Sequence, residues 1–272
     1  MTDALTRVSS WLACPVCGAS LKAEIGRLVC AAGHSFDIAR QGHVNLSGSA
    51  PPPNADTPAM VAARDRLLSS GAYDPIADAL AHRLRRVRRL VEVGAGTGHY
   101  AARVLDAAPE AVGLATDVSP AAARRAARAH ERLASVVADT WGTLPLRSAS
   151  VDAVLCVFAP RNPAEFARIL ARGGLLVVVT PNPGHLAELR EACGLLDIPD
   201  DKSDRLHRSL AGAFEPVVTT RVSRTLTLGV DALTDLIDMG PNAFHEPTHP
   251  DEPMEVALDV QLTVYRRPSP QG

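Results

Sequence analysis

The chain has 272 residues, of which 46% are hydrophobic, so it is long enough and apolar enough to bury a sizeable core. Its formal net charge of −2 excludes the overall basic character of many nucleic-acid-binding proteins. Because we find no run of about 18 apolar residues and no apolar signal core near the N-terminus, we expect a cytoplasmic protein without a membrane segment.

The first feature along the chain is a cluster of residue types that bind metals. Cys14 and Cys17 are separated by two residues, Cys30 follows after twelve more, and His34 after another three. Thiolates and an imidazole from two short turns are the four ligands of a closed tetrahedral zinc site. Buried thiols that cluster by chance are the alternative. Because four protein ligands leave no position for water, we expect one structural Zn²⁺ ion and not a catalytic one.

Composition divides the chain into three zones. Residues 1–46 hold the cysteine and histidine cluster, and residues 47–58, rich in Pro, Ser and Asp, are predicted to form a linker or an ordered crossing loop. Residues 59–272 alternate apolar runs with helical patterns, which is typical of an α/β fold with a mostly parallel sheet.

Within the third zone, helical patterns interrupted near Gly71 precede a series of predicted strands. A helix is predicted to begin after Ser119, which is a suitable N-cap before Pro120. The last two apolar stretches alternate more openly and are predicted to form a closing antiparallel pair. The predicted strands lie within residues 89–93, 111–117, 134–139, 151–160, 173–181, 214–228 and 256–266.

A glycine-rich turn follows the first of these strands. Gly94, Gly96 and Gly98 come directly after it, and a helix is predicted to begin at once. Glycine lets the backbone approach a ligand closely, and a helix N-terminus attracts polar groups of a ligand. The next strand ends at Asp117, about twenty residues later, where a carboxylate can accept hydrogen bonds from ribose hydroxyls. A tight turn with a structural role alone is the alternative.

Two cofactor classes compete for this turn. Dinucleotide-binding proteins use the spacing G-x-G-x-x-G, which residues 94–98 do not supply. The sequence EVGAGTG at 92–98 instead resembles motif I of class I S-adenosylmethionine-dependent methyltransferases. This resemblance implies a Rossmann-like domain with a seven-stranded, mostly parallel sheet, in which Asp139 approaches the adenine and the Gly-Gly pair at 173–174 precedes the fifth strand.

The zinc-ribbon spacing before such a domain, with HSFDIARQGHVNL at 34–46, closely resembles the bacterial 23S ribosomal RNA guanine-N1 methyltransferases, one branch of which confers resistance to tylosin-type macrolides. The resemblance runs from Cys14 to IDMGPNAF at 237–244. It implies methyl transfer from S-adenosylmethionine to N1 of a guanine in a 23S RNA hairpin, a ribbon that recognises RNA, and a homodimer. A small-molecule methyltransferase with a structural ribbon, or a non-enzymatic RNA-binding protein, is the alternative.

Matching the family's motifs position by position implies the site residues. The segment LLSSGAYDPI at 67–76 supplies Tyr73, and PNPGHLAELR at 181–190 supplies His185. The implied cofactor-binding set is Tyr73, Gly94, Gly96, Gly98, His99, Asp117, Asp139 and His185, beside the metal set Cys14, Cys17, Cys30 and His34. No general base is identified.

The segment CVFAP at 156–160 is implied to face the target base. In it, Phe158 is interpreted either as a stacking surface for a flipped guanine or as a core residue. The ribbon is expected to present Lys22, Arg27 and Arg40 to RNA phosphates. The arginine-rich stretches 82–90 and 124–132 are interpreted as solvated helix faces or as further phosphate contacts.

Overall fold

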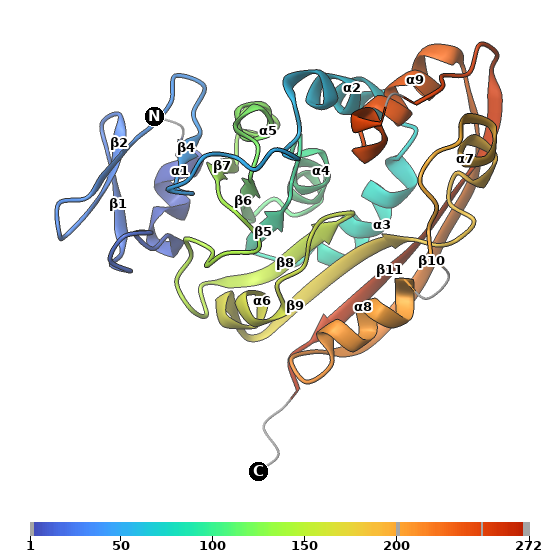
Figure 1. The fold of residues 1–272 in the computed structure, drawn as a ribbon. Helices are drawn as coiled ribbons and strands as arrows, with labels where there is room; N and C mark the ends of the chain where they lie inside the picture. The colour runs from blue at the N-terminus through green and yellow to red at the C-terminus, as the bar shows by residue number, and fades with distance from the viewer. Residues whose placement is uncertain (1–2, 200–201, 246, 269–272) are drawn as a thin grey trace.

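A small antiparallel sheet lies beside a large, mostly parallel one in the computed structural model, which describes residues 3–199, 202–245 and 247–268 (Figure 1). The small sheet holds the cysteine cluster. Its strands follow one another in chain order and are β1 (Leu21–Glu24), β2 (Arg27–Cys30) and β3 (Ser35–Asp37).

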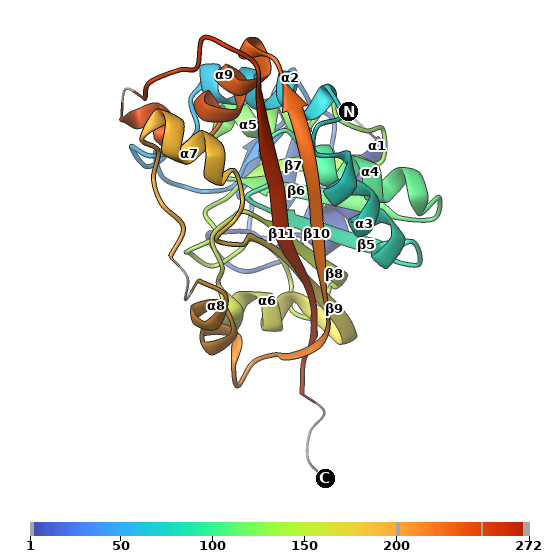
Figure 2. The same ribbon diagram turned by 90° about the vertical axis from the view of Figure 1, so that its right-hand side faces the viewer.

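The large sheet has the strand order β10-β11-β9-β8-β5-β6-β7-β4. Neighbours from β9 to β4 run parallel, whereas β11 is antiparallel to both β9 and β10. Figure 2 shows β10 and β11 as two long strands side by side at one edge. The strands are β4 (Val44–Asn45), β5 (Arg89–Val93), β6 (Val112–Asp117), β7 (Leu133–Val137), β8 (Val151–Val157), β9 (Leu170–Pro181), β10 (Glu215–Leu228) and β11 (Met254–Arg266).

The predicted strands and the closing antiparallel pair are therefore confirmed, but the count of seven strands is wrong by one. The eighth is β4, which comes from the N-terminal zone and pairs with the outer edge of β7. An uncovered edge exposes unpaired backbone groups, and a short added strand satisfies some of them.

Helices cover both faces of the large sheet and create two apolar cores. Successive strand residues point to opposite faces, so Leu155 lies in one core and its neighbour Cys156 in the other. The first core receives side chains from α2 (Pro58–Ser69), α3 (Asp74–Leu84), α4 (His99–Ala107), α5 (Pro120–Ala126), α7 (Ala187–Cys193) and α9 (Val230–Asp238). The second receives them from α1 (Asp3–Val8), α6 (Pro163–Ile169) and α8 (Lys202–Leu210). Among the helices that the structure describes, none is long and apolar enough to cross a membrane.

Local sequence signals place two of these helices where they were predicted. The Ser119 side chain accepts a hydrogen bond from the Ala122 amide, and Pro120 is the first residue of α5. The predicted interruption near Gly71 is confirmed, because Gly71 lies between α2 and α3 with a φ of +83°. Two residues after this glycine, Tyr73 is the buried N-cap residue of α3.

The arginine-rich stretches are partly structural. Arg89 pairs with Asp152 at 2.6 Å, and Arg125 pairs with Asp65 at 2.7 Å. The guanidinium of Arg132 donates to several backbone carbonyls at and just after the C-terminal end of α4, where a cation is favourable. These arginines hold elements together and are not simply a solvated face.

The cysteine zone packs on the large sheet. Helix α1 contacts β6 and β7, and the backbone of residues 11–13 bonds to that of residues 145–147. Leu5, Leu12 and Leu28 belong to the same apolar core as Val91 of the central strand. Unfolding of the ribbon would therefore expose part of this core to water. The predicted boundaries at residues 46 and 58 stay predictions.

Candidate functional site

The predicted zinc ligands converge at one end of the small sheet. One ligand atom from each of Cys14, Cys17, Cys30 and His34 lies within 4.8 Å of the other three. Cys17 Sγ is 3.7 Å from Cys30 Sγ, and His34 Nδ1 is 3.3 Å from Cys30 Sγ and 3.6 Å from Cys14 Sγ. A tetrahedral zinc with bonds of about 2.3 Å to sulfur separates two sulfurs by roughly 3.8 Å. The donor set and its spacing therefore fit one Zn²⁺ ion.

The backbone of the two turns also suits bound thiolates. Gly18 and Gly33 have φ values of +72° and +85°, which lets the chain turn directly after Cys17 and directly before His34. Burial raises the pKa of Cys30, but the backbone amides of His34 and Ala32 and the adjacent side chains lower it overall to about 6. Cys30 is therefore mostly a thiolate at neutral pH, which is the form that binds zinc. The Ala19 amide lowers the pKa of Cys17, but burial and the side chains of Cys14 and Cys30 outweigh it, so this pKa is raised instead.

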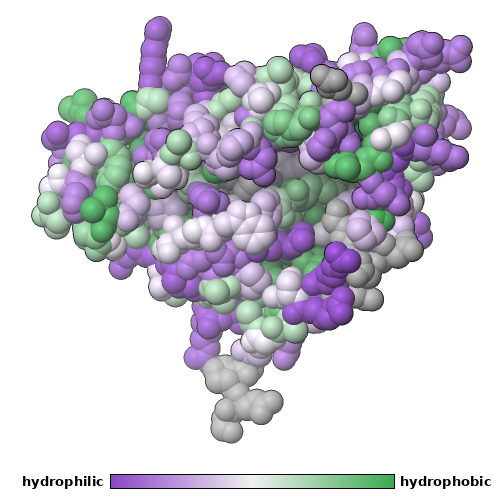
Figure 3. Space-filling view, in the orientation of Figure 1, coloured by the Kyte–Doolittle hydropathy of each residue, from purple (hydrophilic) through white to green (hydrophobic). Residues whose placement is uncertain are grey.

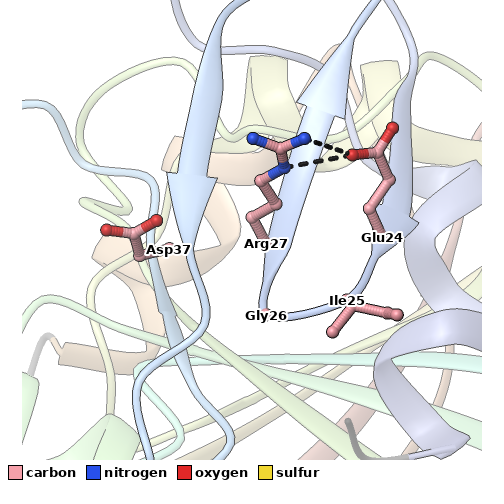
Figure 4. Close-up of a pocket in the computed structure, with 5 residues that line it drawn as sticks. All are labelled: Glu24, Ile25, Gly26, Arg27 and Asp37. Carbon is pink, nitrogen blue, oxygen red and sulfur yellow. Dashed lines mark hydrogen bonds and ion pairs between the residues drawn. The ribbon is translucent and has the colours of Figure 1, made fainter.

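At the far end of the ribbon, the β1–β2 turn forms a shallow depression lined by Glu24, Ile25, Gly26, Arg27 and Asp37 (Figure 4). Figure 4 shows the Arg27 side chain turned toward Glu24, to which it donates hydrogen bonds of 2.8 and 3.0 Å. Arg27 is thus already paired with a carboxylate. Its predicted contact with an RNA phosphate stays a prediction, in which the phosphate replaces an exposed and therefore weak ion pair.

A second site lies at the carboxyl ends of the parallel strands. The chain leaves β5 toward β6, while β8 lies on the other side of β5, so the loops after β5 and β8 diverge at this point. Ligands of open α/β sheets bind at such a switch point. Figure 3 shows the surface hollowed at its centre, between α2 and α9 above and β8 and β9 below.

The glycine turn forms the floor of this second site. Gly94, Gly96 and Gly98 have φ values of +59°, +54° and +77°, in the region that favours glycine. A Cβ on Gly94 would lie 2.5 Å from the Cβ of Ala159, so the turn after β5 touches the loop after β8. Asp117 accepts hydrogen bonds from the amides of Gly96 and Ser119, both at 2.8 Å. The buried carboxylate thereby fixes the turn and keeps further lone pairs for a ligand.

Three segments that are distant in sequence meet over Gly96. The guanidinium of Arg64, on α2, would lie 2.9 Å from a Cβ on Gly96, and it pairs with Asp56 of the linker zone. It also donates to the carbonyl of Met239 at the end of α9, at 2.5 Å. Ser119 Oγ donates to the Asp56 carbonyl at 2.6 Å. Of the two predicted forms of residues 47–58, the contacts of Asp56 therefore favour the ordered crossing loop.

Tyr73, Phe158 and His185 form an aromatic cluster beside this turn. The rings of Phe158 and His185 are stacked, with centroids 5.9 Å apart, and Tyr73 meets both edge-on. Tyr73 Oη is 3.4 Å from His185 Nε2, and His185 Nδ1 accepts the Asp259 amide at 3.2 Å. Because Nδ1 is an acceptor, a neutral His185 carries its proton on Nε2, a tautomer inferred from these contacts.

Phe158 is not a core residue, so the core interpretation is wrong, while its stacking on a guanine stays a prediction. Its side chain is 41% exposed, and its φ is +53°, in a region that a phenylalanine rarely adopts. Such local strain persists only where the surrounding structure imposes it, and it is common at binding sites. The fold thus turns an aromatic face outward beside the glycine turn.

Asp139 and Trp141 lie in the loop after β7. Asp139 Oδ1 accepts the Trp141 amide at 2.9 Å, and no partner of its second oxygen is found among the residues that the structure describes. Asn162 Nδ2 donates to the carbonyls of Thr140, Trp141 and Gly142 from the neighbouring loop. The indole of Trp141 nevertheless remains 70% exposed.

Two further polar groups stand beside the turn. His99 begins α4, and its buried Nε2 has no hydrogen-bond partner in the described part of the chain. A buried ring nitrogen of this kind normally finds its partner in a ligand or in water. Glu92, fully buried at the end of β5, accepts the Ala101 amide at 2.9 Å. Burial raises the pKa of Glu92 to about 8, as does nearby Asp117 to a smaller extent, against the opposing effect of that amide.

The structure thus brings the predicted metal ligands together at one place and the predicted cofactor residues around another. The cofactor roles themselves stay predictions. Sequence reasoning missed Arg64, Asp56, Trp141 and Asn162 as site residues. Arg64 carries no local signal beyond a position on a predicted helix, and Asp56 lies in a segment interpreted as a linker or a crossing loop.

Two protein-family models match the chain. The zinc-ribbon model for the N-terminal region of RlmA matches residues 12–47, and a methyltransferase-domain model matches residues 90–174. The 23S rRNA (guanine(748)-N(1))-methyltransferase of Streptomyces fradiae is 47% identical over 275 residues, covering 95% of this chain and 98% of the relative. A candidate 23S rRNA (guanine-N(1)-)-methyltransferase of Micromonospora griseorubida is 45% identical, covering 94% and 97%.

Solved structures share the fold at lower sequence identity. A chain in the complex between the Haloferax volcanii Trm112 methyltransferase activator and a methyltransferase aligns with a TM-score of 0.56. The two chains are 19% identical, and the alignment covers 79% of this chain and 99% of the other. The class I methyltransferase fold expected from the sequence is therefore confirmed.

The first prediction concerns the metal. We expect about one zinc ion per chain in the purified protein, measured by elemental analysis. Cys17→Ser should lose most of this zinc and also lower the midpoint of thermal unfolding, because the ribbon shares a core with the sheet. A loss of about 2 kcal/mol corresponds to roughly 4–8 °C for a chain of this size. Cys193→Ser, at a cysteine outside the cluster, is the control and should keep its zinc. Equal zinc contents in the two variants would contradict the assignment.

The second prediction concerns the floor of the second site. Gly94→Ala places a Cβ 2.5 Å from Ala159 on a backbone with positive φ. We expect it to lower the free energy of unfolding by about 1–2 kcal/mol from the backbone and about 1–3 kcal/mol more from the overlap. In the matched variant Gly212→Ala, φ is +85° but no atom lies within 4 Å, so only the first cost applies. Urea unfolding measures both variants, and equal losses would show that the contact with Ala159 is not tight.

The third prediction concerns Glu92. Between its ordinary pKa of 4.5 and about 8, the folded chain holds a proton that the unfolded chain has lost. The free energy of unfolding therefore falls as pH rises through this window. Glu92→Gln carries no titrating group and keeps an acceptor for the Ala101 amide. Its stability relative to the wild type should rise between pH 5 and pH 8 and then level off, as measured by urea unfolding. A difference that does not change with pH, as expected for the exposed Glu110→Gln, would refute the shift.

Proposed function

Since the chain belongs to the family of 23S rRNA guanine-N1 methyltransferases, we propose that it methylates N1 of guanine 748, the nucleotide named for its Streptomyces fradiae relative. The methyl donor is S-adenosylmethionine, and the ribbon holds one zinc ion. The observation that carries the proposal is the similarity over 95% of the chain, which spans the ribbon and the hollow together.

The openness of the hollow favours an RNA substrate over a small molecule. A small-molecule methyltransferase is expected to enclose its substrate in a closed, mostly apolar pocket. Here Phe158 is 41% exposed beside the glycine turn, and Trp141 is 70% exposed in the turn that Asn162 holds. A large substrate can reach such a site with a single unstacked base while the rest of it stays outside.

The residues around the hollow offer suitable groups for each part of the cofactor. The glycine turn, His99 and the cation of Arg64 suit the methionine part, whose carboxylate is an anion. The remaining lone pairs of Asp117 suit the ribose hydroxyls, and the second oxygen of Asp139 suits the adenine amino group. Tyr73 and His185 line the side where Phe158 faces outward. These roles form part of the proposal.

The proposed reaction depends mainly on alignment. S-adenosylmethionine supplies the methyl group as an electrophilic sulfonium, and guanine N1 must approach it in line while losing its proton. The exposed face of Phe158 is suited to hold the guanine ring by stacking. His185 is unsuited to remove the proton, because its Nδ1 accepts the Asp259 amide and its Nε2 carries hydrogen. The chain is thus assigned a positioning role, and the released proton has access to solvent at the open hollow.

Two expectations from the resemblance stay predictions. One is the homodimer with an RNA-sized cleft, and the other is a role in macrolide resistance. The homodimer is measurable by light scattering, and resistance by expression of the gene in a sensitive host.

The fourth prediction tests the function directly. N1-methylguanine cannot form a Watson–Crick pair, so reverse transcriptase should stop one nucleotide before it. We expect primer extension on unmodified 23S rRNA, treated with the protein and S-adenosylmethionine, to show a new stop at guanine 748. RNA with adenine at this position is the control and should show none. A stop at another guanine would overturn the target, and no stop, with cofactor binding shown by calorimetry, would overturn the reaction.

A further inference from the structure

Trp141 is an unusual surface residue for this chain. Only two tryptophans are present, and Trp11 is 8% exposed whereas Trp141 is 70% exposed. Exposing an indole leaves a large apolar area in contact with water. Such an exposed ring is unfavourable in the free protein, and binding of a partner that covers it releases this cost.

The backbone that carries Trp141 is held by the protein. Asp139 accepts the Trp141 amide, and the Gly142 amide donates to the Asp139 carbonyl at 3.2 Å. Asn162 donates to three successive carbonyls at distances of 3.1 to 3.4 Å. An exposed side chain on a fixed backbone loses little conformational freedom when it binds a partner. The turn 139–142 therefore holds the exposed ring at a fixed place on the surface.

Asn162 also connects this turn to the substrate side of the hollow. It caps α6 and follows Phe158 by four residues, so the loop 158–162 carries an outward aromatic ring at one end and holds the Trp141 turn at the other. Arg161 in the same loop forms no ion pair among the residues that the structure describes, and it supplies an uncompensated positive charge. Exposed aromatic rings and cations carried by neighbouring loops are the groups that bind unstacked nucleotides and their phosphates.

We infer that Trp141 stacks on the base of an unpaired nucleotide flanking the target guanine, which itself faces Phe158. The inference rests on the proposed function and adds a second contact to it. Stacking on an aromatic ring tolerates any base, so Trp141 selects for an unpaired flanking nucleotide and not for a sequence. The enzyme is therefore expected to prefer target guanines whose neighbouring nucleotide is also unpaired.

The experiment compares Trp141→Ala, Trp141→Phe and a matched control in methylation of an unmodified 23S RNA fragment that contains guanine 748. The control is Val217→Ala, which removes an exposed apolar side chain from β10 at the opposite edge of the sheet. We expect Trp141→Ala to raise KM for RNA roughly tenfold, with most of the loss recovered in Trp141→Phe. KM for S-adenosylmethionine should be unchanged in all three.

Tryptophan fluorescence gives a second readout that does not depend on turnover. Stacking on a base quenches indole emission, so the RNA fragment should quench the wild type but not Trp141→Phe, whose emission comes from buried Trp11. An RNA with abasic sites at the positions flanking guanine 748 should bind with less quenching. RNA binding without quenching, or equal KM values for wild type and Trp141→Ala, would overturn the stacking while leaving the proposed function intact. Failure of the wild type to methylate the fragment would overturn both.

Discussion

The contact between Gly94 and Ala159 is the constraint on which the second site depends. With no room for a Cβ at Gly94, the ends of β5 and β8 approach until their following loops touch. The loop after β8 must then turn away sharply, and Phe158 takes the strained conformation with a φ of +53°. The strain of Phe158 and the positive φ of the glycine turn therefore belong to one packing arrangement, which places the floor of the second site beside an exposed aromatic face.

The ribbon depends on the same sheet, through the edge at which β4 lies. Strand β4 extends the sheet beyond β7, and residues of α1 and of the ribbon fill the core beneath β5 and β6. A module of this size buries too little area to be stable alone, and zinc provides part of what is missing. Here the sheet supplies a further part. The consequence is a fixed relation between the ribbon and the loop after β7, which is where Asp139 and Trp141 lie.

The sequence predicts the parts of this structure that depend on local spacing. The zinc ligands lie in two short turns, and the glycine turn follows an apolar strand, so pattern alone locates both. The side-chain roles of Arg64 and Phe158 depend instead on packing between segments far apart in the chain. Arg64 joins Asp56 to the carbonyl of Met239, 175 residues further on, and no window of sequence contains that relation. Strand β4 escaped prediction for the same reason, since its two residues gain their structure from β7.

Electrostatics connects the glycine turn to the chemistry of the cofactor. Several ionisable groups gather there, among them Glu92, Asp117, Asp56 and Arg64. Burial raises the pKa of Glu92 to about 8, so it is mostly protonated at neutral pH. Burial also raises the pKa of Asp117, against the opposing effect of the Ser119 and Gly96 amides, while Arg64 pairs with Asp56. S-adenosylmethionine carries two positive groups and one negative group, whereas its demethylated product has lost the sulfonium charge. Under the proposed cofactor roles, any negative charge that Asp117 keeps favours the methyl donor over the product. An ionised Glu92 would strengthen that preference only at the cost of leaving a further buried charge unpaired.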